Sequence, residues 1–530
     1  APEGKMTGEI LAEYMGNNGE FGGSGMLGAT KNGFEWMGRI SHKEATNYLD
    51  KIEGRVYNAG FHETDAKFAL GLHRDWGYSH LDLSLVDDTQ EIPDGSRDSV
   101  TRKFTKQITE DDLYRPIVSD AELASYKIPP IHQRVQHFRI YSSNNFTMGP
   151  GRLLVNVGFQ NSRRREFSHP EMPDVPGLFL QLNTISYDLK YQIRDLDGWN
   201  PVFGINGMYQ DNNVTRGTEF VIPSFKQFDI GPFAMVQKTF NKLDISGGLR
   251  CDSRDVNNKE LYSKPDPVTG FDKAVSGTDT AGSDKLFSNY KQGFSGISGS
   301  AGATYNFTEK FSLKANIARG YRSPNISEIS ANGVHPGTNI YQIGNPDFKP
   351  EFSLQEDIGM EFTSKYAAIS ISLFNNSINN YIYNQRLIGS GGADSVLVPG
   401  NQTYKFQQGK GQLYGGEASI DIHPVKMLHF ENSISVVYGR NKGLDPKLES
   451  DSNRYLPFMP PLHGISEIRY DFESKAHHIV HGFLKLQLSY YARQDRVYLA
   501  DNTETPTKGY ALVNAGVGAG FTNARGKTIF

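Results

Sequence analysis

The sequence predicts an all-β protein, a single antiparallel transmembrane β-barrel that occupies residues 1–530 as one domain. Three observations lead to this prediction. About twenty stretches of the chain alternate apolar and polar residues, as strands do when one face meets lipid and the other meets water. The connectors between these stretches are short and long in strict alternation. No apolar run reaches about 18 residues, which excludes a bundle of membrane helices.

The composition agrees with this fold and excludes several classes of protein. Apolar residues make up 37% of the 530 residues, which is too many for a disordered chain. The mean hydropathy of −0.50 is low because only alternate residues of a barrel strand meet lipid. A net charge of −4 gives no electrostatic footprint for nucleic acid, so no nucleic-acid partner is expected. The single cysteine, Cys251, excludes an internal disulfide framework and a zinc site built from cysteines.

The first strands can be followed in order along the chain. We expect the first strand at Lys5–Met15 and the second at Glu20–Ala29, with a short turn at Thr30–Gly33. In the third strand Phe34, Trp36, Gly38 and Ile40 face outward, and Glu35, Met37, Arg39 and Ser41 face inward. After a tight turn at His73–Gly77, the next strand has an outward face of three leucines: Leu81, Leu83 and Leu85.

Residues Lys242–Asp252 show most clearly which face meets water. Leu249 belongs to the apolar face, whereas Asp244, Arg250 and Asp252 fall on the other face. These charged side chains would be costly to pack against a second sheet, but they suit the wall of a water-filled lumen. We therefore expect the charged faces of the strands to point inward.

The connectors fall into two interleaved sets, which predict two different ends of the barrel. Long connectors are expected at Lys43–Gly60, Asp88–Pro130, Asn161–Pro176, Asp211–Pro223, Val256–Ser288, Arg322–Pro350, Tyr381–Lys410, Arg440–Leu456 and Arg493–Lys508. Short connectors are expected at Thr147–Gly151, Arg194–Asn200, Thr239–Lys242, Asn306–Lys310, Thr363–Tyr366, His423–Lys426 and Phe472–His478. Outer-membrane barrels have short periplasmic turns and longer extracellular loops, so the long set marks the extracellular end.

Motifs of known enzyme classes are absent, and we expect no enzyme activity. The chain has no G-x-S-x-G elbow, no H-E-x-x-H helix and no G-x-x-x-x-G-K-[ST] loop. The glycines of 516–520 lie inside an alternating strand with no helix pattern after them, so they indicate close strand packing rather than a nucleotide loop. An outer-membrane hydrolase is therefore the least supported alternative.

Four phrases carry a resemblance to a known family. They are Arg319–Glu328 (RGYRSPNISE), Gly344–Glu351 (GNPDFKPE), Gly411–Glu417 (GQLYGGE) and Met459–Pro461 (MPP). In this pattern the chain resembles the barrel of TonB-dependent outer-membrane receptors. The resemblance implies a barrel of about 22 strands in the outer membrane of a Gram-negative bacterium. It also implies an N-terminal plug domain that contacts the TonB complex, and energy-coupled uptake of a scarce nutrient.

The chain departs from the family pattern at both ends. No plug-like segment precedes Lys5, where the first strand already starts, and about twenty complete strands can be counted. An open barrel would leave unpaired backbone groups in hydrocarbon, which is costly. We therefore expect Phe530 to be a truncation point, with the plug domain and the closing C-terminal strands outside residues 1–530.

Three functions are compatible with these observations. The resemblance favours a receptor for TonB-coupled uptake of a metal ion or a metal chelate, such as zinc or an iron siderophore. The phrases Ser330–Thr338 and Asn380–Gln385 are similar to the branch of the family that takes up zinc and other metals. The strand pattern alone would equally serve a passive porin. A receptor for a non-metal ligand, such as cobalamin or an oligosaccharide, is the remaining alternative.

Candidate ligand-binding residues lie in the predicted extracellular half of the chain, in the long connectors or, for His62, at the beginning of a strand. Imidazole and carboxylate groups suit zinc and similar divalent metals, and this half offers His169, Glu171, His335 and His62. A metal chelate would instead be recognised by aromatic rings and a guanidinium, for which we select Tyr341, Tyr383 and Arg386. No resident cofactor is expected, because any metal would be the transported ligand.

Overall fold

The computed structural model describes residues 4–335, 338, 340–389, 393–444, 447, 449–474, 478–522 and 528–529. Twenty long strands, each of ten residues or more, form its wall. They are β1 (Met6–Met15), β2 (Glu20–Lys31), β3 (Phe34–Ala45), β6 (Phe61–Arg74), β7 (Gly77–Glu91), β8 (His132–Met148), β9 (Gly151–Phe167), β10 (Leu178–Ile193), β11 (Val202–Asn213), β12 (Phe225–Phe240), β13 (Leu243–Asn258), β17 (Tyr290–Thr308), β18 (Phe311–Arg322), β21 (Glu351–Thr363), β22 (Ala367–Arg386), β23 (Gln402–Val425), β24 (Leu428–Asn441), β25 (His463–Ser474), β26 (Ile479–Tyr491) and β27 (Tyr510–Thr522). The all-β prediction is confirmed.

The remaining elements are short. They are β4 (Leu49–Asp50), β5 (Gly54–Arg55), α1 (Asp120–Leu123), β14 (Leu261–Pro265), β15 (Asp272–Val275), the 3-10 helix η1 (Gly277–Thr280), β16 (Asp284–Phe287), α2 (Ile326–Ser330), β19 (Asn332–His335), β20 (Ile340–Ile343) and β28 (Thr528–Ile529). Within the described residues, no helix is both long and apolar enough to cross a membrane.

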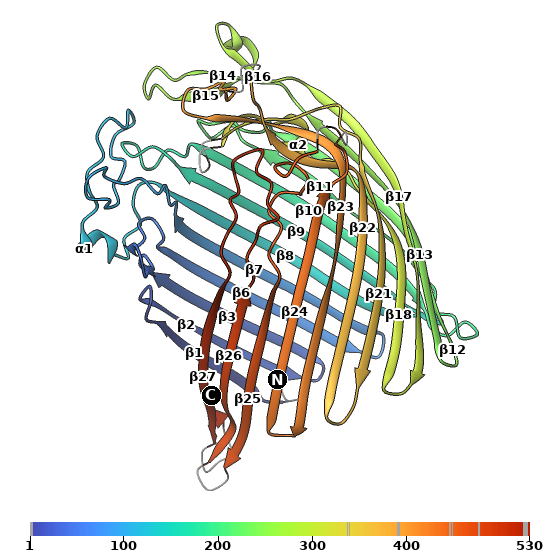
Figure 1. Cartoon of the computed structure of the whole chain (residues 1–530). Helices are drawn as coiled ribbons and strands as arrows, with labels where there is room; N and C mark the ends of the chain where they lie inside the picture. The colour runs from blue at the N-terminus through green and yellow to red at the C-terminus, as the bar shows by residue number, and fades with distance from the viewer. Residues whose placement is uncertain are drawn as a thin grey trace.

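Each long strand pairs antiparallel with the long strands before and after it, and the sheet curls into the wall of a barrel (Figure 1). The strand β1 stands at one end of the sheet, and the short β28, which pairs with residues 521–522 of β27, stands at the other; no pairing joins β1 to β27 or β28 among the described residues. The short strand β20 is the exception to the antiparallel order, because it pairs in parallel with residues 402–405 of β23. Phe530, the expected truncation point, lies outside the described residues.

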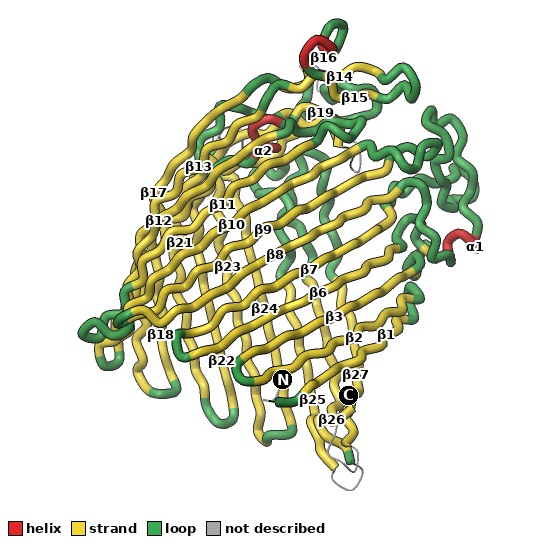
Figure 2. The backbone as a smooth tube through the Cα atoms, turned by 180° about the vertical axis from the view of Figure 1, so that it is seen from behind, coloured by secondary structure: helices red, strands yellow, loops and turns green. Residues whose placement is uncertain are grey.

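The two ends of the wall differ as predicted. Tight turns gather at one end, and the long connectors, with α1, α2 and the β14–β16 sheet, gather at the other (Figure 2). The turn between β2 and β3 shows why the tight turns are so short. Asn32 and Gly33 both have positive φ, 50° and 69°, which suits a two-residue type I′ hairpin. The only short connector at the long-connector end of the described wall is 16–19.

Side chains on the two faces of the wall are chemically distinct. Large apolar side chains stand exposed on the outer face, with Ile10 91%, Leu249 67% and Val517 75% accessible. On the inner face Arg250 pairs with Asp252 at 2.6 Å. The predicted alternation in this strand is therefore confirmed.

Several strands extend further than the sequence predicted, such as β9, which continues to Phe167 past the expected start of its connector at Asn161, and the hairpin of β22 and β23 changes most. The connector expected at Tyr381–Lys410 is shorter, because β22 continues to Arg386 and β23 begins at Gln402. Residues 381–386 pair with residues 404–409 and so prolong the hairpin beyond the alternating region. Loops pack over part of this extension and bury Ile382 and Tyr404, so its side chains do not follow the lipid–water alternation from which strands are predicted.

Buried apolar clusters lie at the long-connector end of the wall, under the loops. One cluster packs Ile326 and Ile329 of α2 against strand residues Phe225, Val256 and Phe294. A second cluster joins four more loop-end residues: Val214, Phe220, Leu261 and Phe287. The loops are thus packed structures that can hold side chains in place for binding.

Candidate functional site

The inner wall is lined by charged side chains that pair across neighbouring strands. Arg254 of β13 makes a two-point contact with Asp229 of β12, with N–O distances of 2.7 and 2.8 Å. Arg134 of β8 contacts Asp87 of β7 in the same way, at 2.8 and 2.6 Å. Such pairs hold the side chains against the wall, because a planar guanidinium matches a carboxylate at two points. The inner face is therefore a fixed polar surface suited to water and polar ligands.

A cavity of about 640 Å³ opens along this surface. It is bordered by the Asp229–Arg254 and Arg250–Asp252 pairs. Arg322, which also borders it, ion-pairs with Glu328 at 3.0 Å and with Glu351. Glu328 belongs to α2, so this arginine ties a loop helix to the wall.

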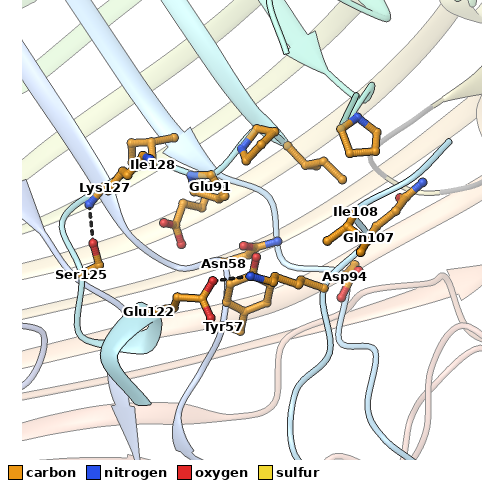
Figure 3. Close-up of a pocket in the computed structure, with 15 residues that line it drawn as sticks. Tyr57, Asn58, Glu91, Asp94, Gln107, Ile108, Glu122, Ser125, Lys127 and Ile128 are labelled. Atoms are coloured by element: carbon orange, nitrogen blue, oxygen red, sulfur yellow. Dashed lines mark hydrogen bonds and ion pairs between the residues drawn. The ribbon is translucent and has the colours of Figure 1, made fainter. Parts of the chain in front are cut away.

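A second cavity, of about 280 Å³, lies at the long-connector end between the loops 46–60 and 92–131 (Figure 3). Figure 3 shows Tyr57 beside Glu122 of α1, with Asn58 between Tyr57 and Glu91. Burial raises the pKa of the Tyr57 phenol, and the charge of Glu91 adds to the effect. A neutral phenol beside the buried carboxylate of Glu91 makes this a pocket of mixed polarity.

An ion pair and hydrogen bonds of Glu122 hold helix α1 at the edge of this pocket. Glu122 ion-pairs with Lys106, and its carboxylate also accepts the backbone N–H of Ser119 at 3.0 Å. These contacts, the Lys106 ammonium first, lower the pKa of Glu122 to about 2. The Ser119 side chain in turn accepts the Glu122 N–H, which completes a capping box at the start of the helix.

Two of the four predicted metal ligands meet at a third residue, Glu110. His169 is buried, with Nδ1 3.1 Å from Glu110 Oε2 and Nε2 2.8 Å from Thr218 Oγ1. The Glu171 carboxylate accepts the Glu110 N–H at 2.9 Å. Both ring nitrogens of His169 are thus already engaged with protein groups.

The other two predicted ligands lie elsewhere on the loop end. His335 is in β19, and its Nδ1 is buried without a hydrogen-bond partner among the described residues. His62 is the second residue of β6 and lies in register with Glu44 and Thr89. Neither residue is gathered with His169 and Glu171 into a set of three metal ligands, so the zinc site stays a prediction.

The residues selected for a chelate lie near one another. Tyr341 in β20 and Arg386 in β22 flank β23, opposite Thr403 and Tyr404 respectively. Tyr383 lies on β22, three residues before Arg386. Arg386 ion-pairs with Asp394.

Two groups of metal-ligating side chains were not anticipated from the sequence. Among the described residues, sets of three side chains within reach of one ion occur twice: Glu35 with His73 and His80, and Asp421 with His423 and His429. Both sets lie beside tight turns, at the end of the wall opposite the long connectors. The available signal was a pair of histidines bracketing a predicted short turn. It becomes informative only when the strand register is known.

Comparison with known proteins gives a sequence match and several structural matches. A family profile described as "TonB dependent receptor-like, beta-barrel" matches residues 9–528. The iron-regulated outer membrane virulence protein of Vibrio cholerae serotype O1 is 24% identical over 145 residues. That alignment covers 26% of this chain and only 22% of the relative's length.

Two solved structures illustrate the shared fold. The copper transporter OprC has a TM-score of 0.71 at 13% identity, and the match covers 97% of this chain and 72% of that protein. The ferric yersiniabactin uptake receptor FyuA from Yersinia pestis has a TM-score of 0.63 at 13% identity, covering 99% and 74%. At such low identity these matches establish the fold alone.

Proposed function

The chain belongs to the TonB dependent receptor-like β-barrel family, and from this premise we propose that it forms the wall of a transporter for TonB-coupled uptake of a metal ion or a metal chelate. Its place is the outer membrane of a Gram-negative bacterium, as for this family. One observation carries the proposal: the family profile spans residues 9–528, the same residues that build a wall with an apolar outer face and a charged inner face.

The proposed partner on the inner side is the TonB complex. We assign residues 1–530 to the barrel domain, because all the long strands described belong to one wall. Contact with TonB would then be made by a plug domain that is not part of this barrel. A lumen walled by about twenty strands is wide, and a plug would keep it from conducting freely.

For the ligand we favour a metal chelate over a bare zinc ion at the loop end. In support of a chelate, Tyr341 and Arg386 flank one strand, and Tyr383 stacks beside Tyr381 with 6.2 Å between ring centroids. Aromatic faces suit a large, flat ligand, and the Arg386 guanidinium would meet an anionic ligand only by exchanging its partner Asp394. Zinc at His169 would have to displace Glu110 or Thr218 from the ring nitrogens.

The proposal is tested by uptake in cells with and without TonB. Two probes separate the ligands: radiolabelled zinc chloride and a radiolabelled ferric catecholate chelate. We expect TonB-dependent uptake of the chelate, and a several-fold loss in Tyr383→Ala. The matched control is Tyr366→Ala, an exposed tyrosine in a tight turn at the opposite end of the wall. Uptake at full rate without TonB would support the passive porin and reject the proposal.

A further inference from the structure

The strongest unassigned feature of the wall is the triad of Glu35, His73 and His80. Glu35 is the second residue of β3, His73 lies near the end of β6, and His80 lies near the start of β7. The registers place Glu35 opposite Gly71, and Gly71 opposite His80. Paired residues of a sheet share a face, and so do residues two apart on one strand, such as Gly71 and His73. The side chains of Glu35, His73 and His80 therefore project from the same side of the wall.

Three potential ligand atoms of this triad converge on one point. Glu35 Oε1 is 3.3 Å from His73 Nε2 and 3.3 Å from His80 Nε2, and the two Nε2 atoms are 3.0 Å apart. Zinc binds imidazole nitrogen and carboxylate oxygen at about 2.0–2.2 Å in tetrahedral sites, so neighbouring ligand atoms lie about 3.3 Å apart. The triad has nearly this spacing without any rearrangement.

Hydrogen bonds alone cannot satisfy all three contacts between Glu35 Oε1 and the two Nε2 atoms at once. If both Nε2 atoms carry hydrogen, two N–H groups oppose each other at 3.0 Å. If one does not, its lone pair faces the Glu35 carboxylate. A divalent cation at the centre would be attracted by all three atoms at once, which is the arrangement that metal sites use.

The surroundings leave room for the carboxylate and for a fourth ligand. A Cβ added at Gly71 would lie 2.4 Å from Glu35 Oε1, so this glycine provides the space that the carboxylate occupies. Glu35 and His80 also border a cavity of about 330 Å³ in the wall. The side chains of His73, His80 and Glu35 are 48%, 33% and 39% accessible, so solvent reaches the ion position.

We propose that Glu35, His73 and His80 form a binding site for a divalent transition metal of the zinc class, with the fourth coordination position open to water. Three protein ligands and an open position are typical of sites whose ion or fourth ligand exchanges, whereas structural zinc sites have four protein ligands. The site lies at the tight-turn end, which faces the periplasm in this family of folds. It is distinct from the loop-end residues, and zinc can bind there whether or not the protein transports a chelate.

The test is a calorimetric titration of the purified protein in detergent with Zn²⁺. The second triad is first removed by His423→Ala and His429→Ala, so that Glu35, His73 and His80 are the one remaining set of three converging ligands among the described residues. In this background we expect one zinc ion per protein. Glu35→Gln and His80→Ala should each weaken binding by at least about tenfold, since mutation even of groups that only support a metal ligand typically costs about 10–100-fold. Gly71→Ala keeps all three ligands but displaces the carboxylate, and it should weaken binding as well.

The matched control is His42→Ala, which removes from the same strand, β3, a histidine whose imidazole hydrogen-bonds to Thr64. Zinc affinity should be unchanged in this variant. X-ray absorption of the zinc-loaded background protein should show imidazole nitrogens at about 2.0–2.1 Å. Should His80→Ala fail to fold, Glu35→Gln decides, because it preserves side-chain volume. An unchanged zinc affinity in Glu35→Gln and Gly71→Ala, or the absence of imidazole around the zinc, would overturn the proposal.

Discussion

The imidazole of His169 stacks on the ring of Phe271 with 3.7 Å between ring centroids. The same imidazole hydrogen-bonds to Glu110 on one side and to Thr218 on the other. These four residues belong to four different long connectors. His169 therefore connects four long connectors and stabilises their arrangement at the loop end of the barrel.

We predict that His169→Ala loosens these loops without unfolding the wall. The buried imidazole makes two hydrogen bonds, and their loss, at about 0.5–1.5 kcal/mol each, should lower the local free energy of opening by about 1–3 kcal/mol. Hydrogen exchange in the loops 92–131 and 214–224 should accelerate accordingly, while exchange in the wall strands stays slow. As a control, His42→Ala, an exposed imidazole on β3, should leave loop exchange unchanged. Equal loop exchange in both variants would show that His169 does not stabilise the contacts between the loops.

The Arg254–Asp229 pair on the inner wall should contribute to the stability of the barrel. Arg254→Met leaves Asp229, whose side chain is only 18% accessible, without its two-point partner. We expect a loss of about 1–3 kcal/mol in the free energy of unfolding, measured by urea titration in lipid vesicles. The exposed loop pair Arg493–Asp495 is the control, because Arg493→Met should cost about 1 kcal/mol or less. The two variants would behave alike if the inner wall were as hydrated as a loop.

Acidification should release helix α1 from the pocket edge. Lys106 and the Ser119 N–H hold the pKa of Glu122 at about 2, below its usual 4.5. A carboxyl whose pKa is lower in the folded state than in the unfolded state stabilises the folded loop at pH values above the unfolded-state pKa. This contribution is lost as the pH falls from about 4.5 towards 2. The protection factors of the amides at residues 119–124, which correct for the pH dependence of intrinsic exchange, should therefore fall over that range. In Glu122→Gln the protection factors should already be low at neutral pH and should not change over the same range.

The two faces of the wall can be distinguished with a pair of neighbouring positions. Leu249 lies on the outer face of β13, and Ser298 of β17, opposite Arg250, borders the inner cavity. In a Cys251→Ser background in lipid vesicles, Ser298→Cys should react with a membrane-impermeant maleimide. Leu249→Cys should react only after denaturation. The reverse pattern would mean that the faces have been assigned the wrong way round.

The fold was largely predictable from the sequence, because strand faces and connector lengths are local properties. The pattern predicted both the turn at Asn32–Gly33 and the separation of Glu35 from the exposed apolar face of β3 that carries Phe34 and Ile40. The end of β22 was missed, since its last residues pair above the lipid, where no alternation is required. Local patterns therefore describe the wall but not the loop-end hairpins.

The candidate sites were much less predictable. His169 and Glu171 were selected for their chemistry, but their common partner Glu110 is about sixty residues away and could not be foreseen. His73 and His80 bracket a predicted turn, yet they became a candidate site only when the register brought Glu35 to them. Binding sites depend on contacts between segments that are distant in the sequence, and the alternation of apolar and polar residues along one strand does not predict such contacts.

The central claim is that this wall serves energy-coupled uptake. It is tested most directly by the accumulation of a radiolabelled ferric catecholate chelate in cells before and after a protonophore collapses the proton-motive force. Cells that lack the protein provide the baseline. The account predicts that uptake above this baseline stops when the proton-motive force is lost. Continued uptake at the same rate, as expected of passive diffusion through a pore, would contradict it.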